Sequence, residues 1–274
     1  MTGRDVLLEI VTENLPARLC PGAAEQFKAC AAEEFAAAGL TCGPIDAYAT
    51  CRRLVLYAQD APAGPGARAL AGIFPRLIAR LQFPDAMTWE PSRFPFARPI
   101  RGLVALHGEK LVTFSLAGLK SGRVTDGHDA AGPRRLKVPA AERYFRTLEH
   151  ACVLVKDGQR LEALRSGLAA AGKRMKLQVE PDADLLRESL YLAEYPVVVV
   201  GGFSQEFLAL PPEVLRSALK AALFFPVADS AGRPQPYFAG VRDGVSKGQR
   251  NVEEGFRAAA EAALAAARRR AGKS

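Results

Sequence analysis

The sequence has few of the residues from which metal sites and nucleophilic active sites are usually built. It contains three histidines and five cysteines in 274 residues, and no two of the cysteines form a C-x-x-C pair. Zinc sites and disulfide frameworks need such residues at short, regular spacings. We therefore expect free thiols, no metal site, no cofactor bound by this chain and no catalytic residue.

Long hydrophobic runs are absent as well. The longest strongly apolar run covers residues 196–203, which is too short to span a bilayer. The first nine residues include Arg4, Asp5 and Glu9, which interrupt the apolar stretch that a signal peptide requires. We therefore expect a cytoplasmic protein.

What the sequence does contain is an excess of positive charge. Its 37 basic and 29 acidic residues give a net charge of +8. Such an excess favours a polyanionic partner such as nucleic acid, although arginine-rich surfaces also occur without one. The basic residues cluster at 52–53, 134–137, 173–176 and 268–273.

Hydrophobic periodicity predicts both strands and helices, in an order that favours an α+β protein. Period-two or continuous apolar runs predict strands over residues 6–11, 45–50, 54–58, 103–106, 111–116, 197–200, 225–227 and 237–241. Period-3.6 patterns predict helices over residues 21–38, 69–81, 139–150, 158–175, 184–193, 212–223 and 251–270. The four valines at 197–200 indicate a strand that is buried on both faces.

Two adjacent arginines, Arg52 and Arg53, lie between the strands predicted at 45–50 and 54–58. Because side chains alternate along a strand, one of the two should point into the protein. That arginine either forms an internal ion pair with Glu9 or Glu13, or lies on a groove that contacts RNA. The sequence leaves both alternatives open.

A glycine-rich segment, GLKSGRVTDGHD, covers residues 118–129 directly after a predicted strand. Its Asp126, His128 and Asp129 are groups that can transfer protons. A histidine beside aspartates in such a segment is, however, more often a hydrogen-bonded turn residue. The segment is therefore a catalytic loop, a nucleic-acid-contacting loop or a turn.

Several stretches together carry a resemblance that goes beyond patterning. The sequence resembles, in order and over most of its length, the N-terminal part of the beta subunit of the bacterial heterotetrameric glycyl-tRNA synthetase. The stretches are DVLLEIVTENLPARL (5–19), ATCRRLVLYAQD (49–60), the 74–128 segment with its M-x-W, RF, RPI and GRVTDGH motifs, and residues 192–220 and 224–238.

The resemblance implies an α+β fold with mixed or antiparallel sheets flanked by helices, like the B3/B4 region of the phenylalanyl-tRNA synthetase beta subunit. The segments it implies are an N-terminal α/β unit (1–62), a B3/B4-like body (67–250) and an alanine-rich C-terminal helix with a basic tail (251–274).

In that family a separate alpha subunit carries the adenylate-forming site. The resemblance therefore implies an auxiliary protein in glycine–tRNA ligation without its own aminoacylation site, and ATP and magnesium would act only through the alpha subunit. The expected partners are tRNA, the alpha subunit or, in a homodimer, a second copy of the chain. One alternative is a stand-alone paralogue that keeps the fold as a binding module for another partner. Another is a hydrolase of misacylated tRNA that uses the His128 loop.

The resemblance also places the candidate binding residues, because they fall within the family's motif regions. The RNA- or ligand-binding candidates are Arg52, Arg53, Arg98, Arg101, Lys120, Arg123 and His128.

The sequence departs from the family pattern in three ways. It ends at Ser274, before the later domains of the beta subunit, so we expect a cut fragment or a naturally short relative. The run KAALFFPV (220–227) replaces a polar E-H-Q-R-Y-F-P-V run, and Asp129 replaces an arginine that would attract phosphate. These replacements favour the short relative.

Overall fold

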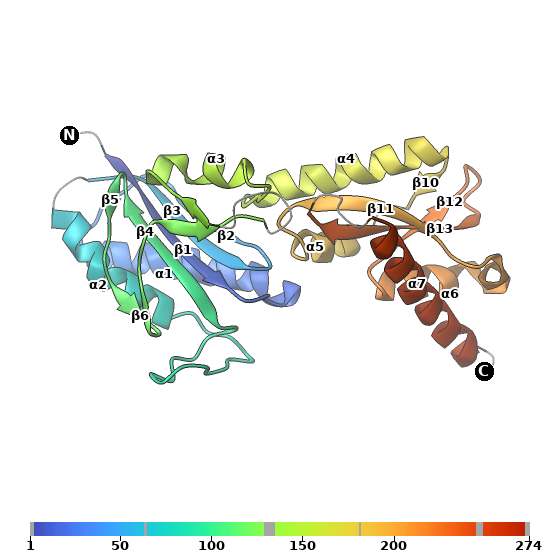
Figure 1. Ribbon diagram of the computed structural model, residues 1–274, viewed down its shortest axis with the longest axis horizontal. Helices are drawn as coiled ribbons and strands as arrows, with labels where there is room; N and C mark the ends of the chain where they lie inside the picture. Colours follow the sequence, from blue (N-terminus) through green and yellow to red (C-terminus); the bar gives the residue numbers. More distant parts are fainter. Residues whose placement is uncertain (1–2, 63–64, 129–134, 181, 245–248, 272–274) are drawn as a thin grey trace. The chain divides into compact units, whose positions relative to one another are not determined.

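The computed structural model describes residues 3–62, 65–128, 135–180, 182–244 and 249–271. The chain divides into two compact units, Met1–Asp157 (unit 1) and Gly158–Ser274 (unit 2). Each unit combines an antiparallel sheet with helices (Figure 1). This confirms the expected α+β class with antiparallel sheets.

Unit 1 is built on a five-stranded antiparallel sheet with the strand order β2-β3-β1-β4-β5. The strands predicted over 45–50 and 54–58 pair as a hairpin, in which the Thr50 hydroxyl accepts the main-chain N–H groups of Arg52 (3.2 Å) and Arg53 (3.1 Å) and thereby closes the turn. The strands are β1 (Arg4–Thr12), β2 (Ile45–Ala49), β3 (Arg53–Ala61), β4 (Ile100–His107) and β5 (Lys110–Leu111).

Helices cover both faces of this sheet, with α1 and α2 on one side and α3 on the other (Figure 1). The core on the α3 side includes Leu7, Val55, Val104 and Leu148. Because both faces are covered, β1 is buried along its central residues, in which Glu9 is the one charged side chain. The helical segments are η1 (Ala17–Leu19), α1 (Cys20–Ala37), α2 (Pro65–Ala79), η2 (Ala141–Arg143) and α3 (Tyr144–Glu149).

Four short strands follow the main sheet of unit 1 in sequence. The strand predicted over 111–116 is wrong as a single element, because Phe114 N–H bonds the Ser121 hydroxyl (2.9 Å) and the chain turns to pair with residues 119–120. The pair at 124–126 and 135–137 was not predicted. The strands are β6 (Ser115–Leu116), β7 (Leu119–Lys120), β8 (Val124–Asp126) and β9 (Arg135–Lys137).

Unit 2 holds a four-stranded antiparallel sheet with the order β10-β12-β13-β11. Its strands are β10 (Gln178–Val179), β11 (Pro196–Gly202), β12 (Phe225–Ala228) and β13 (Pro234–Asp243). Its helical segments are α4 (Asp157–Met175), α5 (Ala183–Leu190), η3 (Gln205–Ala209), α6 (Pro212–Ala221) and α7 (Gln249–Ala271). The strands predicted over 225–227 and 237–241 are confirmed, and they pair as a hairpin.

The two faces of the unit 2 sheet pack against different helices. Phe225 and Ala239 contact Leu168 of α4 and Leu185 of α5. Phe238 lies in a separate cluster that includes buried residues of α6 and α7. The prediction that the valine strand is buried on both faces is wrong, because β11 is the edge strand and its valines other than Val199 stay partly exposed.

The two units do not coincide with the segments expected from the sequence. The expected boundary at residues 62–67 falls inside unit 1, because β4 pairs directly with β1. The expected separate helix at 251–274 belongs to unit 2, because Ala260 and Leu264 of α7 are buried in that unit's core.

Candidate nucleic-acid interface

A buried ion pair joins the central strands of unit 1. Arg53, the first residue of β3, is 1% exposed, and its Nη1 lies 2.8 Å from Oε1 of Glu9 on β1, which is 0% exposed. The hydroxyl of Tyr144 on α3 donates to the same oxygen at 2.6 Å. The internal ion pair with Glu9 is thus the alternative that the structure confirms for Arg53. Glu13 pairs instead with Arg101.

The same guanidinium reaches the segment that carries the glycine-rich motif. Nη1 of Arg53 lies 3.3 Å from the Thr125 hydroxyl, and Nη2 donates to the main-chain carbonyl of Asp126 at 3.1 Å. Arg53 therefore connects β8 to the central strands β1 and β3. Because the side chain is buried, it has no surface to offer to RNA.

A hollow of about 460 Å³ lies on the surface of unit 1 next to this network. Residues from β1, β4, β7, β8 and β9 and from the turn before β8 line it. We call it the basic hollow, after its charged lining residues Arg101, Lys120, Arg123, Asp126 and Arg135. Three of the seven sequence-predicted candidates, Arg101, Lys120 and Arg123, are thus brought together there.

Four cations and one carboxylate belong to the described lining of the basic hollow, which is therefore positively charged. Lys120 and Arg135 are exposed, and within the described residues neither forms an ion pair. Arg101 is 61% exposed and pairs with Glu13 at the rim. Asp126 lies opposite Arg135 in the β8–β9 register, so the carboxylate partly offsets the charge of that arginine. A surface hollow lined mainly by one sign of charge concentrates ligands of the opposite sign.

Arg123 is held in place by main-chain groups. Its Nη1 donates to the carbonyl of Pro139 at 3.2 Å and its Nη2 to that of Glu109 at 3.0 Å. In the described part of the chain no carboxylate pairs with this guanidinium, so its charge is not neutralised. Holding the side chain in advance lowers the entropy cost of binding an anion.

The uncharged side chains in the described lining of the basic hollow are aliphatic or small, and none is aromatic. The uncharged residues are Val11, Gly102, Leu103, Leu119, Gly122, Val124 and Thr125. Proteins that bind unpaired bases stack them on aromatic side chains. The described lining therefore offers positive charge and no ring on which a base could stack.

The remaining candidates lie elsewhere in unit 1. Arg52 is partly exposed in the turn between β2 and β3, and Nη1 of Arg98 donates to the carbonyl of Ala97 at 2.6 Å. His128 is 4% exposed, and its main-chain N–H donates to the Ala151 carbonyl at 3.1 Å. None of these three candidates belongs to the described lining of the basic hollow. Asp129 lies outside the described residues.

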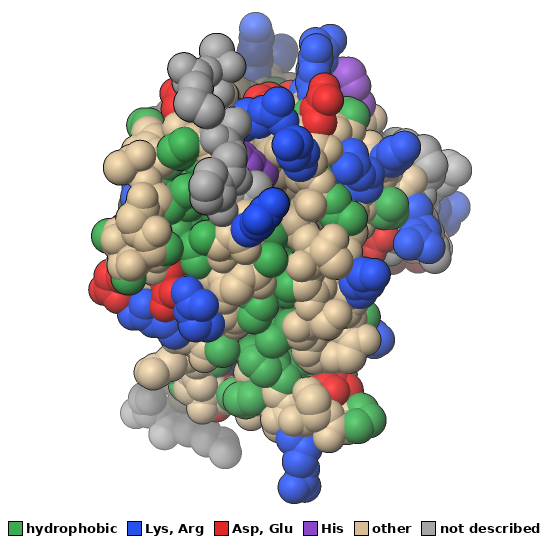
Figure 2. Space-filling view, turned by 90° about the vertical axis from the view of Figure 1, so that its left-hand side faces the viewer, with side chains coloured by type: hydrophobic (Ala, Val, Ile, Leu, Met, Phe, Trp, Pro, Cys, Tyr) green, Lys and Arg blue, Asp and Glu red, His purple; other side chains and the backbone are tan. Residues whose placement is uncertain are grey.

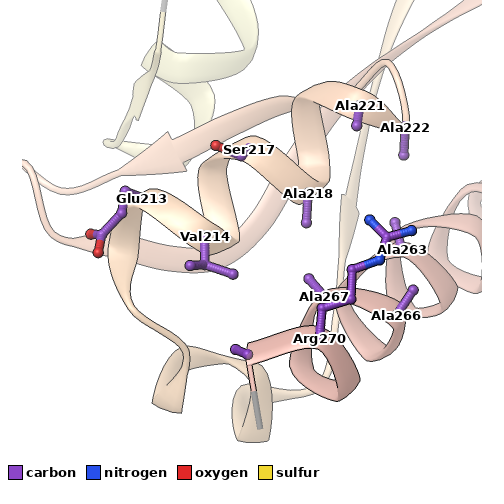
Figure 3. A pocket seen from close by; sticks show the side chains of 11 residues that line it. Glu213, Val214, Ser217, Ala218, Ala221, Ala222, Ala263, Ala266, Ala267 and Arg270 are labelled. Carbon is purple, nitrogen blue, oxygen red and sulfur yellow. The ribbon is translucent and has the colours of Figure 1, made fainter. Parts of the chain in front are cut away.

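A second surface hollow, of about 670 Å³, lies between α6 and α7 in unit 2 (Figure 3). Alanine side chains of both helices form most of its wall, with Glu213, Ser217 and Arg270 as the polar members. The KAALFFPV run contributes Ala221 and Ala222 to this wall. With so few polar groups, the hollow offers apolar contact and little that could direct a reaction.

The face seen in Figure 2, at the left-hand end of Figure 1, carries Lys and Arg side chains (blue) over much of its upper half. Hydrophobic side chains (green) form a band down its middle.

Among the described residues there is no group of three or more His, Cys, Asp or Glu side chains that could hold a metal ion. In the same residues, no helix is both long enough and apolar enough to cross a membrane.

A family model described as the glycyl-tRNA synthetase beta subunit matches residues 6–68 and 60–268. The chain belongs to the glycyl-tRNA synthetase beta subunit family. This confirms the resemblance on which the candidate residues were chosen.

Individual relatives of the beta subunit family agree with this assignment. The glycine–tRNA ligase beta subunit of Halothermothrix orenii is 38% identical over 201 residues, which are 73% of this chain and 29% of that protein. That of Desulforudis audaxviator is 31% identical over 327 aligned residues, covering 95% of this chain and 47% of that protein. For the Bacillus subtilis protein the identity is 33%, over 73% of this chain and 30% of that protein. This chain therefore spans less than half the length of each of these beta subunits.

Sequence reasoning did not select Arg135 or Tyr144. Arg135 belonged to a noticed basic cluster, but its position in the hollow depends on the short β8–β9 pair, which has no clear periodic pattern. Tyr144 reaches Glu9 across 135 positions of sequence, and no local pattern marks such a contact.

Proposed function

We propose that this beta-subunit-family chain is an auxiliary component of glycine–tRNA ligation that holds the phosphate backbone of tRNA in the basic hollow. The observation that supports the proposal is the convergence on one hollow of four cations, three from the separate strands β4, β7 and β9 and one from the turn before β8, with a single carboxylate among the described lining residues. Phosphate contacts provide much of the affinity of proteins for nucleic acids and do not require base recognition.

The aminoacylation chemistry, in this proposal, belongs to a separate alpha subunit, through which ATP and magnesium act. The proposed partners of the chain are therefore tRNA and that alpha subunit. We also propose that the antiparallel α+β architecture is of the B3/B4 type found in the phenylalanyl-tRNA synthetase beta subunit. Formation of glycyl-adenylate by the purified chain alone would contradict the auxiliary role.

The two alternative functions, a hydrolase and a stand-alone binding module, require different features of the molecule. A hydrolase of misacylated tRNA would need His128 at the surface, and its burial gives that reaction no support. A stand-alone binding module would use the basic hollow for another anionic partner. Competition between tRNA and a simple polyanion such as heparin separates these cases, because selective retention of tRNA supports the synthetase-related role.

The proposal is tested by measuring tRNA binding across a salt series with the Lys120→Ala/Arg135→Ala double variant. Each phosphate contact contributes a slope of about −0.9 to the dependence of log affinity on log salt concentration. We expect salt-dependent binding by the unaltered chain. The double variant should bind more weakly, with a slope shallower by about one to two. A mobility-shift or filter assay between about 50 and 200 mM salt gives both quantities.

A matched control removes one positive charge from unit 1 outside the basic hollow. Lys28 on α1 is 57% exposed, and its Nζ lies 3.5 Å from the Asp46 carboxylate. Lys28→Ala should leave the slope unchanged. If the chain shows no salt-dependent binding at micromolar concentration, or if the control and the double variant behave alike, the basic hollow is not the tRNA site.

A further inference from the structure

We propose that the buried Arg53 is a positioning residue for the basic hollow: it holds the segment of residues 123–126 in the position from which that segment forms one wall. The proposal rests on the proposed function, because the hollow must bind a ligand for its positioning to matter. Arg53 itself does not line the hollow. Its role is to act through Thr125 and Asp126, to which it is bonded.

The wall segment is attached at its start by Arg123, whose guanidinium bonds the carbonyls of Pro139 and Glu109 and whose own carbonyl accepts the Val138 N–H at 2.8 Å. The main chain is bonded to β4 at Gly122, which exchanges hydrogen bonds with Leu103 (2.8 Å) and Ala105 (3.1 Å). Beyond that point the segment pairs with β9, a strand of three residues that belongs to no larger sheet. Among the described residues, the hydrogen bonds that join β8 to the central strands β1 and β3 come from Arg53. Two-stranded ribbons of this size have little stability by themselves.

The geometry requires an arginine specifically. A guanidinium carries five N–H donors in a fixed plane, and here it serves a carboxylate on β1 and a hydroxyl and a carbonyl on β8. A lysine has one nitrogen at the end of its chain, so it can take the place of Nη1 beside Glu9 and Thr125 but leaves the Asp126 carbonyl, which Nη2 bonds, without that donor. Arg53→Lys therefore keeps the positive charge beside Glu9 and removes the hydrogen bond that attaches the wall segment at Asp126.

The test is a tRNA-binding measurement on the full 274-residue chain carrying Arg53→Lys. We expect the variant to fold, to bind tRNA about tenfold more weakly, and to show a salt slope shallower by about one. Folding is followed by the fluorescence of Trp89, the one tryptophan in the sequence. Thr125→Val removes one acceptor of Arg53 while keeping the side-chain shape, and should weaken binding in the same direction by a smaller factor.

A double-mutant cycle distinguishes positioning from general loss of structure. Arg123 lies on the wall that Arg53 holds, whereas Lys120 lies on β7. Arg123→Ala should therefore weaken binding less in the Arg53→Lys background than alone, while the effects of Lys120→Ala and Arg53→Lys should add. A merely structural role of Arg53 predicts the same coupling to both residues.

The outcomes separate this proposal from the one on which it rests. If the unaltered chain binds no tRNA in a salt-dependent way, the proposed function fails. If it binds and a folded Arg53→Lys variant has the same affinity and slope, or couples equally to Arg123 and Lys120, the positioning role is overturned. Should Arg53→Lys not fold, the comparison of Thr125→Val with the unaltered chain decides, and equal binding overturns the proposal.

Discussion

A charged pair in the interior of a small unit costs several kcal/mol per ion in lost hydration, so it persists only when hydrogen bonds replace the water. In unit 1, Arg53 meets this condition with three acceptors, and Glu9 receives both the guanidinium and the Tyr144 hydroxyl on one oxygen. Each member of the network is therefore sensitive to removal of its neighbour.

Tyr144→Phe should destabilise unit 1 by about 1–3 kcal/mol, because the buried Glu9 carboxylate loses a donor that water cannot replace. Urea unfolding monitored by Trp89 fluorescence measures the change. The control is Tyr48→Phe, since the Tyr48 ring packs edge-on against Phe145 at 5.6 Å and this contact survives the substitution. Equal stability of the Tyr144→Phe variant and the unaltered chain would show that the hydroxyl contributes nothing to the network.

The sequence predicted part of this network and could not predict the rest. Strand alternation placed one of two adjacent arginines inside and left an ion pair with Glu9 or Glu13 and a contact with RNA as alternatives, of which the structure confirms the pair with Glu9. The contacts to Thr125 and Tyr144 lie 72 and 135 positions away in sequence, and depend on how separate elements pack. His128 shows the same limit, because neighbouring residues indicate its chemistry and only the fold determines its burial.

At the level of helices and strands, prediction succeeded where the local pattern was long. Helices α1, α4 and α7 and strands β1 and β13 carry periodic or continuous apolar residues over many positions, and all were predicted to within a few residues. The pair of β8 and β9 was missed, since three residues cannot establish a period. The partial exposure of β11 depends on its place at the sheet edge, which the strand's own residues do not specify.

Helix α5 allows an element-scale prediction about pH. Asp182 is its N-cap: Oδ1 accepts the Leu185 N–H at 2.8 Å, and Oδ2 lies 2.8 Å from Nζ of Lys220. Hydrogen bonding to Lys220, followed by that to the Leu185 N–H, holds the pKa of Asp182 below its ordinary value. A carboxyl with a lowered folded-state pKa stabilises the fold at neutral pH, and this contribution is lost as the pH falls through that pKa.

Asp182→Asn keeps a capping oxygen but removes the charge, so unit 2 should lose up to about 1 kcal/mol at neutral pH. Asp182→Ala removes the cap as well and should cost about 0.5–2 kcal/mol. Urea unfolding followed by circular dichroism at neutral pH, and again in acid below the ordinary aspartate pKa, measures both variants. A difference between the unaltered chain and Asp182→Asn that persists in acid would argue against the ion pair as its source.

On the scale of the whole molecule, the chain forms two units, each with its own hydrophobic core. The basic hollow lies entirely in unit 1, and the cluster around Leu264 lies entirely in unit 2. The proposed binding of tRNA should therefore be insensitive to core substitutions in unit 2 as long as the chain stays folded.

Leu264→Ala tests this separation. Leu264 is 0% exposed, and truncating a buried leucine costs about 2–5 kcal/mol. Circular dichroism should show the loss of stability, while the tRNA affinity measured without denaturant stays unchanged. The control Leu208→Ala, at a position that is 38% exposed, should cost little. A parallel fall in tRNA affinity for Leu264→Ala would mean that unit 2 takes part in binding.

The sharing of one guanidinium among β1, β3 and β8 also limits how the protein can change over generations. Replacing Glu9 alone leaves the buried Arg53 cation without its carboxylate. Replacing Arg53 alone leaves the buried Glu9 carboxylate without its cation and removes the hydrogen bond to β8 at Asp126. A homologue that lacks this network should have replaced residues 9, 53, 125 and 144 together, because replacing them one at a time passes through destabilised proteins. Natural homologues should accordingly keep or lose these four side chains as a group.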